Sequence, residues 1–203
     1  MYQRFYFKHV FGYLLSILII MLLLIPCLII AFCIKIDSKG PIFFKQIRIG
    51  KNMKPFYIYK FRTMTHDVDR KGNHELIGLN EADGPVFKVK NDPRLTKVGN
   101  FIRKYSLDEI PQFWNVFKLD MTLVGPRPLP DYEVEEIQSD FKFRRHIILP
   151  GITGLWQTTE RNKISTFAKW VELDLDYIEN CTFLLDLKII AKTILILLGG
   201  KSH

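Results

Sequence analysis

The sequence predicts an α+β fold in which a mostly helical single domain with a small β-hairpin follows a bent apolar helix. Residues Val10–Ile34 form a run of 25 residues without a formal charge, which is the first observation behind this prediction. Two short segments rich in Phe, Tyr, Ile and Lys then flank a Gly-Lys-Asn turn, as in a β-hairpin. From residue 94 onward, helical patterns with start and stop signals follow one another to residue 198.

The apolar run has three possible interpretations: a secretory signal, a straight membrane span or a re-entrant hairpin. A secretory signal is disfavoured because its apolar region is usually about 7–15 residues long and ends at small residues. A straight helix of this length would reach about 37 Å and is therefore long enough to span. Pro26, however, interrupts helical hydrogen bonding, and basic residues flank both ends of the run. These residues are Arg4 and Lys8 before it, then Lys35, Lys39, Lys45 and Arg48. We therefore expect residues 1–40 to form a re-entrant membrane helix hairpin broken at Pro26.

The remaining residues, 41–203, are expected to form one domain. Gly40-Pro41 ends the membrane element, strands cover 42–49 and 56–61, and residues 66–84 are polar enough for a loop. The expected helices are 94–105, a segment from Ser106 or Glu109 through Phe117, 131–146, 165–179 and 182–198. The last of these is short for a span and is expected to lie in the membrane interface or to pack on the domain.

The charge is distributed unevenly along the chain. Residues 1–105 hold 18 Lys and Arg against 7 Asp and Glu, a net charge of +11, whereas residues 106–203 carry a net charge of −3. Together with the apolar run, this excludes a disordered chain, a disulfide-stapled mini-protein and a plain water-soluble enzyme. A basic half that contacts a membrane favours an anionic lipid or a phosphate-bearing substrate. The five His residues lack zinc-site spacing, and no GxGxxG or GxxxxGK[ST] motif occurs.

An acidic pair, Asp108-Glu109, lies within basic sequence and has two interpretations. Ser106 and Glu109 fit the S-x-x-E capping box of a helix that begins at Leu107. Pro111 would then fall in the second turn, where it clashes with an earlier carbonyl. A helix that begins near Ile110 would instead leave both carboxylates just outside its N-terminus, beside free N–H groups that favour an anionic ligand.

Two further segments have a rigid backbone. Pro126 and Pro128 enclose Arg127 and fix the direction of its guanidinium, which suits bidentate recognition of a phosphate or is simply a turn with an exposed arginine. The segment 150–157, Pro-Gly-Ile-Thr-Gly-Leu-Trp-Gln, is rich in turn residues and ends in a large aromatic side chain.

Taken together, these motifs resemble the bacterial sugar transferases, the monotopic phosphoglycosyl transferases that act on polyprenyl phosphate. The matching segments are 60–64, 84–88, 91–94, 106–112, 115–116, 125–128, 145–146, 150–154 and 156–157, with Asp186 and Thr193 in the last helix. The run Leu119-Asp120-Met121-Thr122 departs mildly from the family pattern, and Thr158-Thr159-Glu160-Arg161-Asn162 departs more.

The resemblance implies transfer of a sugar 1-phosphate from a UDP-sugar to undecaprenyl phosphate, which gives an undecaprenyl-diphosphate-sugar and UMP. It implies that Asp108 and Glu109 are catalytic, with Asp108 forming a covalent phosphosugar intermediate and Mg²⁺ bound at Asp108. The phosphate- and nucleotide-binding residues would be Lys60, Arg62, Arg103, Arg127 and Arg145, and the structural prolines at the site Pro26, Pro111, Pro126 and Pro128. It also implies a bacterial inner-membrane enzyme whose catalytic domain is on the cytoplasmic face and supports the re-entrant reading of the apolar run.

Two other functions remain open at this point. A magnesium-dependent lipid phosphatase or pyrophosphatase would use water to resolve the intermediate, and a non-catalytic scaffold of a glycan assembly complex would not need Asp108. The expected partners are the UDP-sugar, undecaprenyl phosphate and membrane lipids, without nucleic acid. The sequence leaves open the sugar, a homo-oligomeric state, and whether the glycan is an exopolysaccharide, a capsule, an O-antigen or a glycoprotein glycan.

Overall fold

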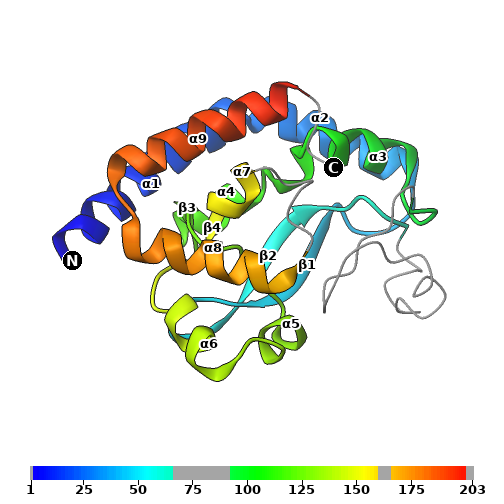
Figure 1. The fold of residues 1–203 in the computed structure, drawn as a ribbon. Coiled ribbons are helices and arrows are strands. Elements are labelled where there is room, and N and C mark those ends of the chain that lie inside the picture. The colour runs from blue at the N-terminus through cyan, green and yellow to red at the C-terminus, as the bar shows by residue number, and fades with distance from the viewer. Residues whose placement is uncertain (1, 66–91, 160–165, 200–203) are drawn as a thin grey trace.

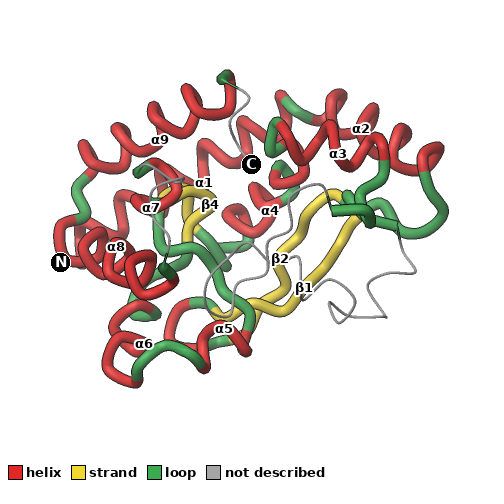
Figure 2. Tube along the Cα trace, turned by 45° about the vertical axis from the view of Figure 1, so that its right-hand side comes forward, coloured by secondary structure: helices red, strands yellow, loops and turns green. Residues whose placement is uncertain are grey.

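The computed structural model describes residues 2–65, 92–159 and 166–199. Helices α1, α2 and α9 run across the top of the molecule in Figure 1, and a short β-hairpin lies below α2 and α3. Helix α8 crosses the middle, with α5 and α6 beneath it. Figure 2 shows the same arrangement from the side, with helices as the larger part and two small groups of strands. The predicted α+β class, mostly helical with a small sheet, is therefore confirmed.

The N-terminal apolar run forms two helices, α1 (Tyr2–Leu22) and α2 (Leu24–Asp37), which are bent by 61° at Leu23. The bend precedes Pro26 by one turn because a proline ring clashes with the carbonyl four residues earlier, here that of Leu22. Pro26 itself lies in the first turn of α2, where its missing N–H costs nothing. Among the described residues no single helix has both the length and the apolarity to cross a bilayer, whereas Lys8–Leu22 and Leu24–Asp37 pass together as a bent pair.

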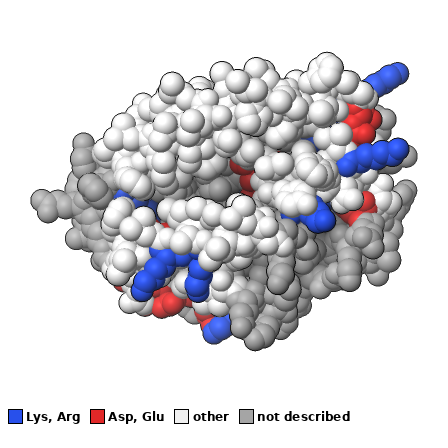
Figure 3. Space-filling view, turned by 90° about the horizontal axis from the view of Figure 1, so that it is seen from above, with Lys and Arg blue, Asp and Glu red and all other residues white. Residues whose placement is uncertain are grey.

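The face formed by α1, α2 and α9 (Phe183–Leu198) is apolar and open. Leu28, Phe32 and Leu195 each expose more than 60% of their surface. Figure 3 looks down on this face and shows a largely uncharged surface with a hollow between the helices. An apolar area of this extent marks a membrane or protein contact.

Contacts from three elements hold α1 against the rest of the chain. Tyr13 of α1 stacks on Phe117 of α4 (Gln112–Phe117), with ring centroids 5.3 Å apart. The Lys8 Nζ lies 3.1 Å from Asp186 Oδ2 of α9 in a mostly buried ion pair. The Tyr177 hydroxyl donates to Asp186 Oδ1 and adds α8 (Phe167–Asn180) to the same network. Removal of one member of a buried ion pair is costly. This network therefore fixes the bent pair of helices α1 and α2, called the anchor below, relative to the rest of the described chain.

The predicted β-hairpin is present. Strands β1 (Phe43–Ile49) and β2 (Pro55–Phe61) pair antiparallel over their full length. The turn contains the 3₁₀ element η1 (Lys51–Met53), in which Asn52 adopts a left-handed backbone with φ 56°. Asparagine tolerates this conformation better than most residues, so the turn suits the sequence.

A second, parallel pair was not predicted from the sequence. Strand β3 (Thr122–Val124) pairs with β4 (Gly151–Thr153), which brings the Arg127 segment and the 150–157 segment together. A Cβ atom on Gly151 would lie 2.1 Å from the backbone nitrogen of Gly125, so the two backbones can approach only because residue 151 is glycine.

Threonine caps begin three of the described helices after residue 92, namely α3, α8 and α9. Thr96 accepts a hydrogen bond from Gly99 at the start of α3 (Lys97–Lys104), three residues later than the predicted start. Thr166 caps α8, while Ser165, the predicted cap, lies outside the described residues. Thr182 caps α9, as the predicted bounds 182–198 imply.

The single helix predicted over 131–146 is wrong. The chain forms α5 (Asp131–Glu135) and α6 (Ser139–Arg145), separated by an extended backbone at Gln138 with ψ 141°. The break allows Ile137, 5% exposed, to enter the core while α6 turns to pack against α8. The gain from burying this side chain outweighs the loss of helical hydrogen bonds.

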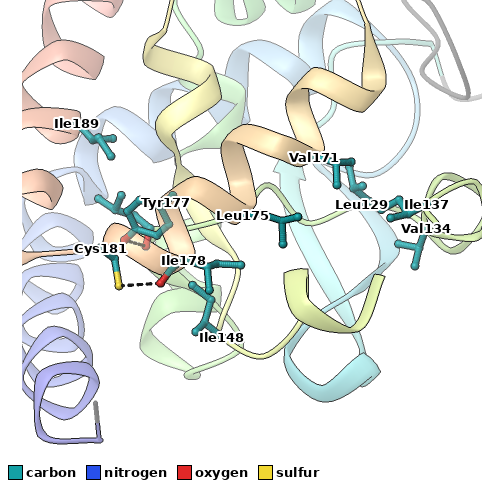
Figure 4. Packing of buried hydrophobic residues seen from close by; sticks show 11 residues of the cluster. Leu129, Val134, Ile137, Ile148, Val171, Leu175, Tyr177, Ile178, Cys181 and Ile189 are labelled. Carbon is teal, nitrogen blue, oxygen red and sulfur yellow. Dashed lines mark hydrogen bonds between the residues drawn. The ribbon is translucent and has the colours of Figure 1, made fainter. Parts of the chain in front are cut away.

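The main core lies between α8 and the segments that flank it (Figure 4). Its buried residues are Val124, Leu129, Val134, Ile137, Ile148, Val171, Leu175, Tyr177, Ile178, Cys181 and Ile189. A smaller cluster joins Ile34 of α2 to Phe61 of β2 and Ile102 of α3. The predicted loop at 66–84 and the matching segment 84–88 lie outside the described residues.

Replacing Gly99 of α3 by alanine is expected to destabilise the protein by about 3 kcal/mol or more, as overpacked sites do. A Cβ atom there would lie 1.9 Å from the carbonyl oxygen of Thr63, which is backbone and cannot rotate away. The matched control is Gly12→Ala in α1, where the nearest atom would be 3.6 Å away and the higher helix propensity of alanine should add up to about 1 kcal/mol. Thermal unfolding of both variants in detergent would test this, and equal midpoints would contradict it.

Candidate active site

The acidic pair lies in a tight turn between two helices. Ser106 has a left-handed backbone with φ 52° and makes no side-chain cap bond, so the capping-box interpretation is wrong. Leu107–Glu109 form the 3₁₀ element η3, and Pro111 is the N-cap residue of α4. The helix therefore begins beyond the pair, as the second interpretation predicted, because Pro111 is accommodated only at a helix start.

A cavity of about 250 Å³ opens beside this turn. Asp108 and Glu109 supply its acidic groups, and the other residues that line it are Phe44, Arg48, Lys60, Phe61, Arg62, Thr63, Met64, Arg103 and Arg127. Five cationic side chains around two carboxylates give the wall a net positive charge, which favours an anionic ligand. The structure thus brings together the predicted catalytic pair and four of the five predicted phosphate-binding residues.

Asp108 is the perturbed carboxylate at this wall. It is 7% exposed, and its Oδ1 atom is buried without a hydrogen-bond partner in the described structure. Burial raises the pKa of Asp108 from the ordinary 3.8 to about 6. The charge of Lys60 opposes this rise, the charge of Glu109 adds to it, and that of Arg103 opposes it. A carboxylate held in this way is a candidate nucleophile.

Glu109 and Lys60 form an ion pair across the cavity wall. Lys60 Nζ of β2 lies 2.7 Å from Glu109 Oε1. Asn115 of α4 fixes their relative position: its Oδ1 accepts from the Tyr59 backbone N–H at 3.1 Å, and its Nδ2 donates to the Tyr57 carbonyl at 2.7 Å. Asn115 is fully buried, and both ends of its amide are hydrogen-bonded. It therefore joins the hairpin to α4 and to the turn that holds Asp108 and Glu109, called the dyad turn below.

Arg127 also lines this cavity. Its guanidinium carbon lies 5.9 Å from the centroid of the Trp156 ring, within cation–π range. The Arg127 carbonyl accepts a hydrogen bond from Arg145, whose guanidinium also pairs with Asp174 at 2.7 Å. Arg145 is 3% exposed and does not line the cavity, so the structure gives it the task of holding the Arg127 backbone.

Arg62 borders the cavity, but its guanidinium is directed to the end of the anchor. It donates to the carbonyls of Ser38 and Lys39, which follow α2, and the side chain is 4% exposed.

Pro26, the first of the predicted structural prolines, lies just after the bend between α1 and α2. One residue later, Cys27 packs in the same cluster as Leu107 of the dyad turn. The bend thus places α2 in the hydrophobic cluster that also holds Leu107, the neighbour of Asp108.

A second cavity, of about 410 Å³ and largely apolar, lies on the other side of the acidic pair. It is lined by Leu15, Ile19, Leu23, Tyr105, Ser106, Leu107, Glu109, Ile110, Phe113, Leu123, Ile152, Thr153, Gln157, Ile190, Thr193, Ile194, Ile196 and Leu197. Glu109 is the acidic residue among those that line this cavity. Glu109 lines both cavities, so the polar and apolar spaces adjoin at the dyad.

Arg48 is the site residue that sequence reasoning missed. The sequence placed it only among the basic residues that follow the apolar run, although it ends on the cavity wall. Neighbouring residues of a strand point to opposite faces, so Arg48 of β1 lies on the face opposite to exposed Ile47. This alternation was the signal in the sequence that could have indicated an inward-facing Arg48.

A wall of this charge suits a phosphorylated ligand, and an adjoining apolar space open to an apolar face suits a lipid. The geometry therefore defines a class of protein that brings phosphate chemistry to a lipid surface. The chain belongs to the bacterial sugar transferase family, whose model matches residues 2–200. The predicted family is confirmed, and with it the class of enzyme, a transferase.

Three relatives illustrate the similarity. Galactosyl transferase CpsE of Streptococcus agalactiae serotype III is 46% identical over 163 residues, which are 80% of this chain and 36% of the relative. The uncharacterized sugar transferase EpsL of Bacillus subtilis is 45% identical over 86% of this chain and 80% of its own length. A UDP-glucose:undecaprenyl-phosphate glucose-1-phosphate transferase of Klebsiella pneumoniae is 40% identical over 93% of this chain. The chain spans 39% of that protein, so it corresponds to part of the longer relatives.

Proposed function

We propose that this protein transfers a sugar 1-phosphate from a UDP-sugar to undecaprenyl phosphate, as the first membrane step in the synthesis of a polysaccharide or glycoconjugate. The observation that carries the proposal is the buried Asp108, with one unpartnered oxygen, in a cation-lined cavity that adjoins an apolar one. The name of the Klebsiella relative describes this reaction for glucose, whereas the name of CpsE refers to galactose. The family resemblance supports the reaction without specifying the sugar.

In the first step, a carboxylate oxygen of Asp108 attacks the sugar-side phosphorus of the donor. The bond from that phosphorus to the bridging oxygen breaks, its electron pair remains on the bridging oxygen, and UMP leaves. In the second step, an oxygen of undecaprenyl phosphate attacks the same phosphorus, and the bond to Asp108 breaks to restore the free carboxylate. Splitting the transfer in this way lets each half-reaction be catalysed in one site.

The cationic wall would counter the repulsion between an anionic nucleophile and an anionic diphosphate. The charges of Lys60 and Arg103 both lower the pKa of Asp108, and Arg127 lines the same cavity. Fixed charges of this kind stabilise the charge that develops on the transferred phosphoryl group. Glu109 keeps Lys60 in position through its 2.7 Å ion pair.

Magnesium fits the proposed chemistry. Mg²⁺ is commonly held by one or two carboxylates together with substrate phosphates, and the free, buried Oδ1 of Asp108 offers one such ligand. Among the described residues no group of three or more His, Cys, Asp and Glu could hold a metal without substrate. The ion, when bound at Asp108, would offset charge on the donor diphosphate.

The membrane arrangement is part of the proposal. The bent pair of α1 and α2 would enter and leave the bacterial inner membrane by its cytoplasmic face, with α9 lying along the interface. Lys8 and Lys35, at the two ends of the pair, would then both stay near the headgroups. The apolar cavity between α1 and α9 would receive the first isoprene units of the acceptor.

The test uses the full chain in detergent or nanodiscs with Mg²⁺ and a panel of UDP-sugars. UMP release without acceptor, limited to one equivalent of protein, and a phosphosugar adduct on Asp108 by mass spectrometry are the expected results. Continued release of free sugar phosphate would instead indicate a phosphatase that uses water. No release from any UDP-sugar would contradict the proposal and leave a scaffold role.

The pH dependence of the first half-reaction should follow the ionisation of Asp108. Only the carboxylate attacks, so the rate of the UMP burst is expected to fall tenfold per pH unit below about 6, where Asp108 becomes protonated. The Lys60→Met change removes a charge that lowers the pKa of Asp108, so this midpoint should move to higher pH. Lys45→Met, on an exposed position of the same hairpin, is the control. The single-turnover burst is measured because it excludes titration of the acceptor phosphate. An unchanged midpoint in the Lys60 variant would contradict the assignment.

A further inference from the structure

We infer that Arg48, together with Arg127, binds the phosphate that stays on the departing nucleotide. The inference rests on the proposed function and assigns a further substrate-binding residue within it. It follows from how the Arg48 guanidinium is held, from the charge beside it, and from the division of the cavity's cations into two pairs.

The Arg48 guanidinium is fixed from two sides at the cavity wall. Nη1 donates to the carbonyl of Pro128 at 3.2 Å, and Nη2 donates to Gln46 Oε1 at 2.6 Å. The Nε atom is buried and has no hydrogen-bond partner within the described structure. A buried N–H without a partner is costly, so a ligand that accepts from it would gain more than an exposed contact gives. The group is thus preorganised for an anion.

The charge around Arg48 is also unbalanced. Burial, followed by the nearby positive charge of Arg127, lowers the pKa of Arg48 to about 10. The negative charge of Glu133 opposes this lowering of the Arg48 pKa. Burial in turn raises the pKa of Glu133, because that carboxylate is itself poorly solvated. Two guanidinium groups held close together in a partly dry wall attract a phosphate strongly, because its oxygens can accept from both.

Four of the five cations that line the cavity fall into two pairs, and the fifth, Arg62, bonds to backbone carbonyls after α2. Lys60 and Arg103 are the positive charges with most influence on Asp108, whereas Arg127 is the positive charge with most influence on Arg48. In the proposed reaction the attacked phosphate must lie beside Asp108, and therefore beside Lys60 and Arg103. The second phosphate of the donor, one bridging oxygen away, would then lie toward Arg48 and Arg127. When the bridging bond breaks, this phosphate gains negative charge, and the second pair stabilises it.

A structural role must be separated from phosphate binding, because Arg48 also ties β1 to the Arg127 segment. The experiment measures binding of UMP and of uridine to the full chain in detergent by calorimetry. Arg48→Met is expected to weaken UMP binding by about 10- to 100-fold and to leave uridine binding unchanged, since a hydrogen-bonded charge contributes on that order. Arg48→Lys should recover part of the UMP affinity because it restores the charge. Lys45→Met, which removes a cation from an exposed position of the same strand, should have no effect.

Three outcomes would overturn the inference. UMP affinity in Arg48→Met equal to that of the unaltered protein would exclude phosphate binding. Equal losses of UMP and uridine, without recovery in Arg48→Lys, would show that Arg48 acts only on the shape of the site. UMP that fails to bind the unaltered protein would also overturn it. Failure of the proposed function has a different signature, because the unaltered protein would then release no UMP from any UDP-sugar.

Discussion

The Asp108→Asn variant is expected to lose sugar-phosphate transfer by about four orders of magnitude, because an amide cannot serve as the attacking group. The residual rate should show no covalent adduct, since no carboxylate oxygen remains at position 108. Burst and steady-state UMP release, together with mass spectrometry of the intact chain, measure both effects. Asp140→Asn, at an exposed position of α6, is the matched control and should retain full activity. A fully active Asp108→Asn variant would exclude the proposed mechanism.

The same variant should be more stable than the unaltered protein at neutral pH. Burial raises the pKa of Asp108 above its ordinary 3.8, so folding favours the protonated form. The contribution of Asp108 to the free energy of unfolding is therefore greatest below about pH 4 and is lost as the pH rises through about 6. The ionised carboxylate then costs up to about 3 kcal/mol. Asparagine is neutral throughout, so its advantage should appear at pH 8 and vanish near pH 4 in thermal unfolding experiments. This trade of stability against activity distinguishes a catalytic carboxylate from a structural one.

Local features of the sequence predicted the hairpin and the last helix. The two strands follow from β-forming residues around a turn, and Asn52 adopts the left-handed backbone that such a turn requires. The predicted last helix, 182–198, agrees with α9, and Thr182 caps it because its hydroxyl accepts a hydrogen bond from a free N–H group of the first turn. The two interpretations of the dyad were resolved by Pro111, whose backbone restrictions the sequence already showed.

Features that depend on distant packing were not predictable in this way. The pairing of Thr122–Val124 with Gly151–Thr153 joins segments far apart in the chain, and neither strand is long enough to give a periodic pattern. The sequence around Arg145 is the same whether its side chain faces a ligand or Asp174. Only the fold shows that it faces Asp174. The break at Gln138 likewise depends on the core that receives Ile137.

The position of Arg48 shows the same limit. In the sequence it is one of several basic residues near a membrane segment, and its strand alternates between exposed and half-buried side chains. The place of the hairpin beside α4 depends on contacts such as those of Asn115, which bonds the backbone of β2 to α4. The cation-lined cavity wall is therefore assembled from the hairpin, the turn that holds Asp108 and Glu109, and the Arg127 segment by contacts that no single motif contains.

Filling the apolar cavity is expected to block the second half-reaction and spare the first. Ile194 of α9 lines this cavity and is 51% exposed, so tryptophan at position 194 can be accommodated without overpacking the core. The Ile194→Trp variant should form the phosphosugar adduct and release one equivalent of UMP normally, because the donor occupies the polar cavity. Turnover with undecaprenyl phosphate should fall at least about tenfold, since the isoprene units lose their binding space.

The next residue of α9 provides the matched control. Leu195 is 69% exposed and does not line the cavity, so Leu195→Trp adds the same side chain to the same helix on the open apolar face. Its turnover should remain close to that of the unaltered protein. Equal turnover in the two variants would show that the acceptor lies elsewhere, and loss of the UMP burst in Ile194→Trp would show that the two cavities hold one substrate. The expected pattern, a retained burst with lost turnover, requires two adjoining sites that share the dyad at Glu109.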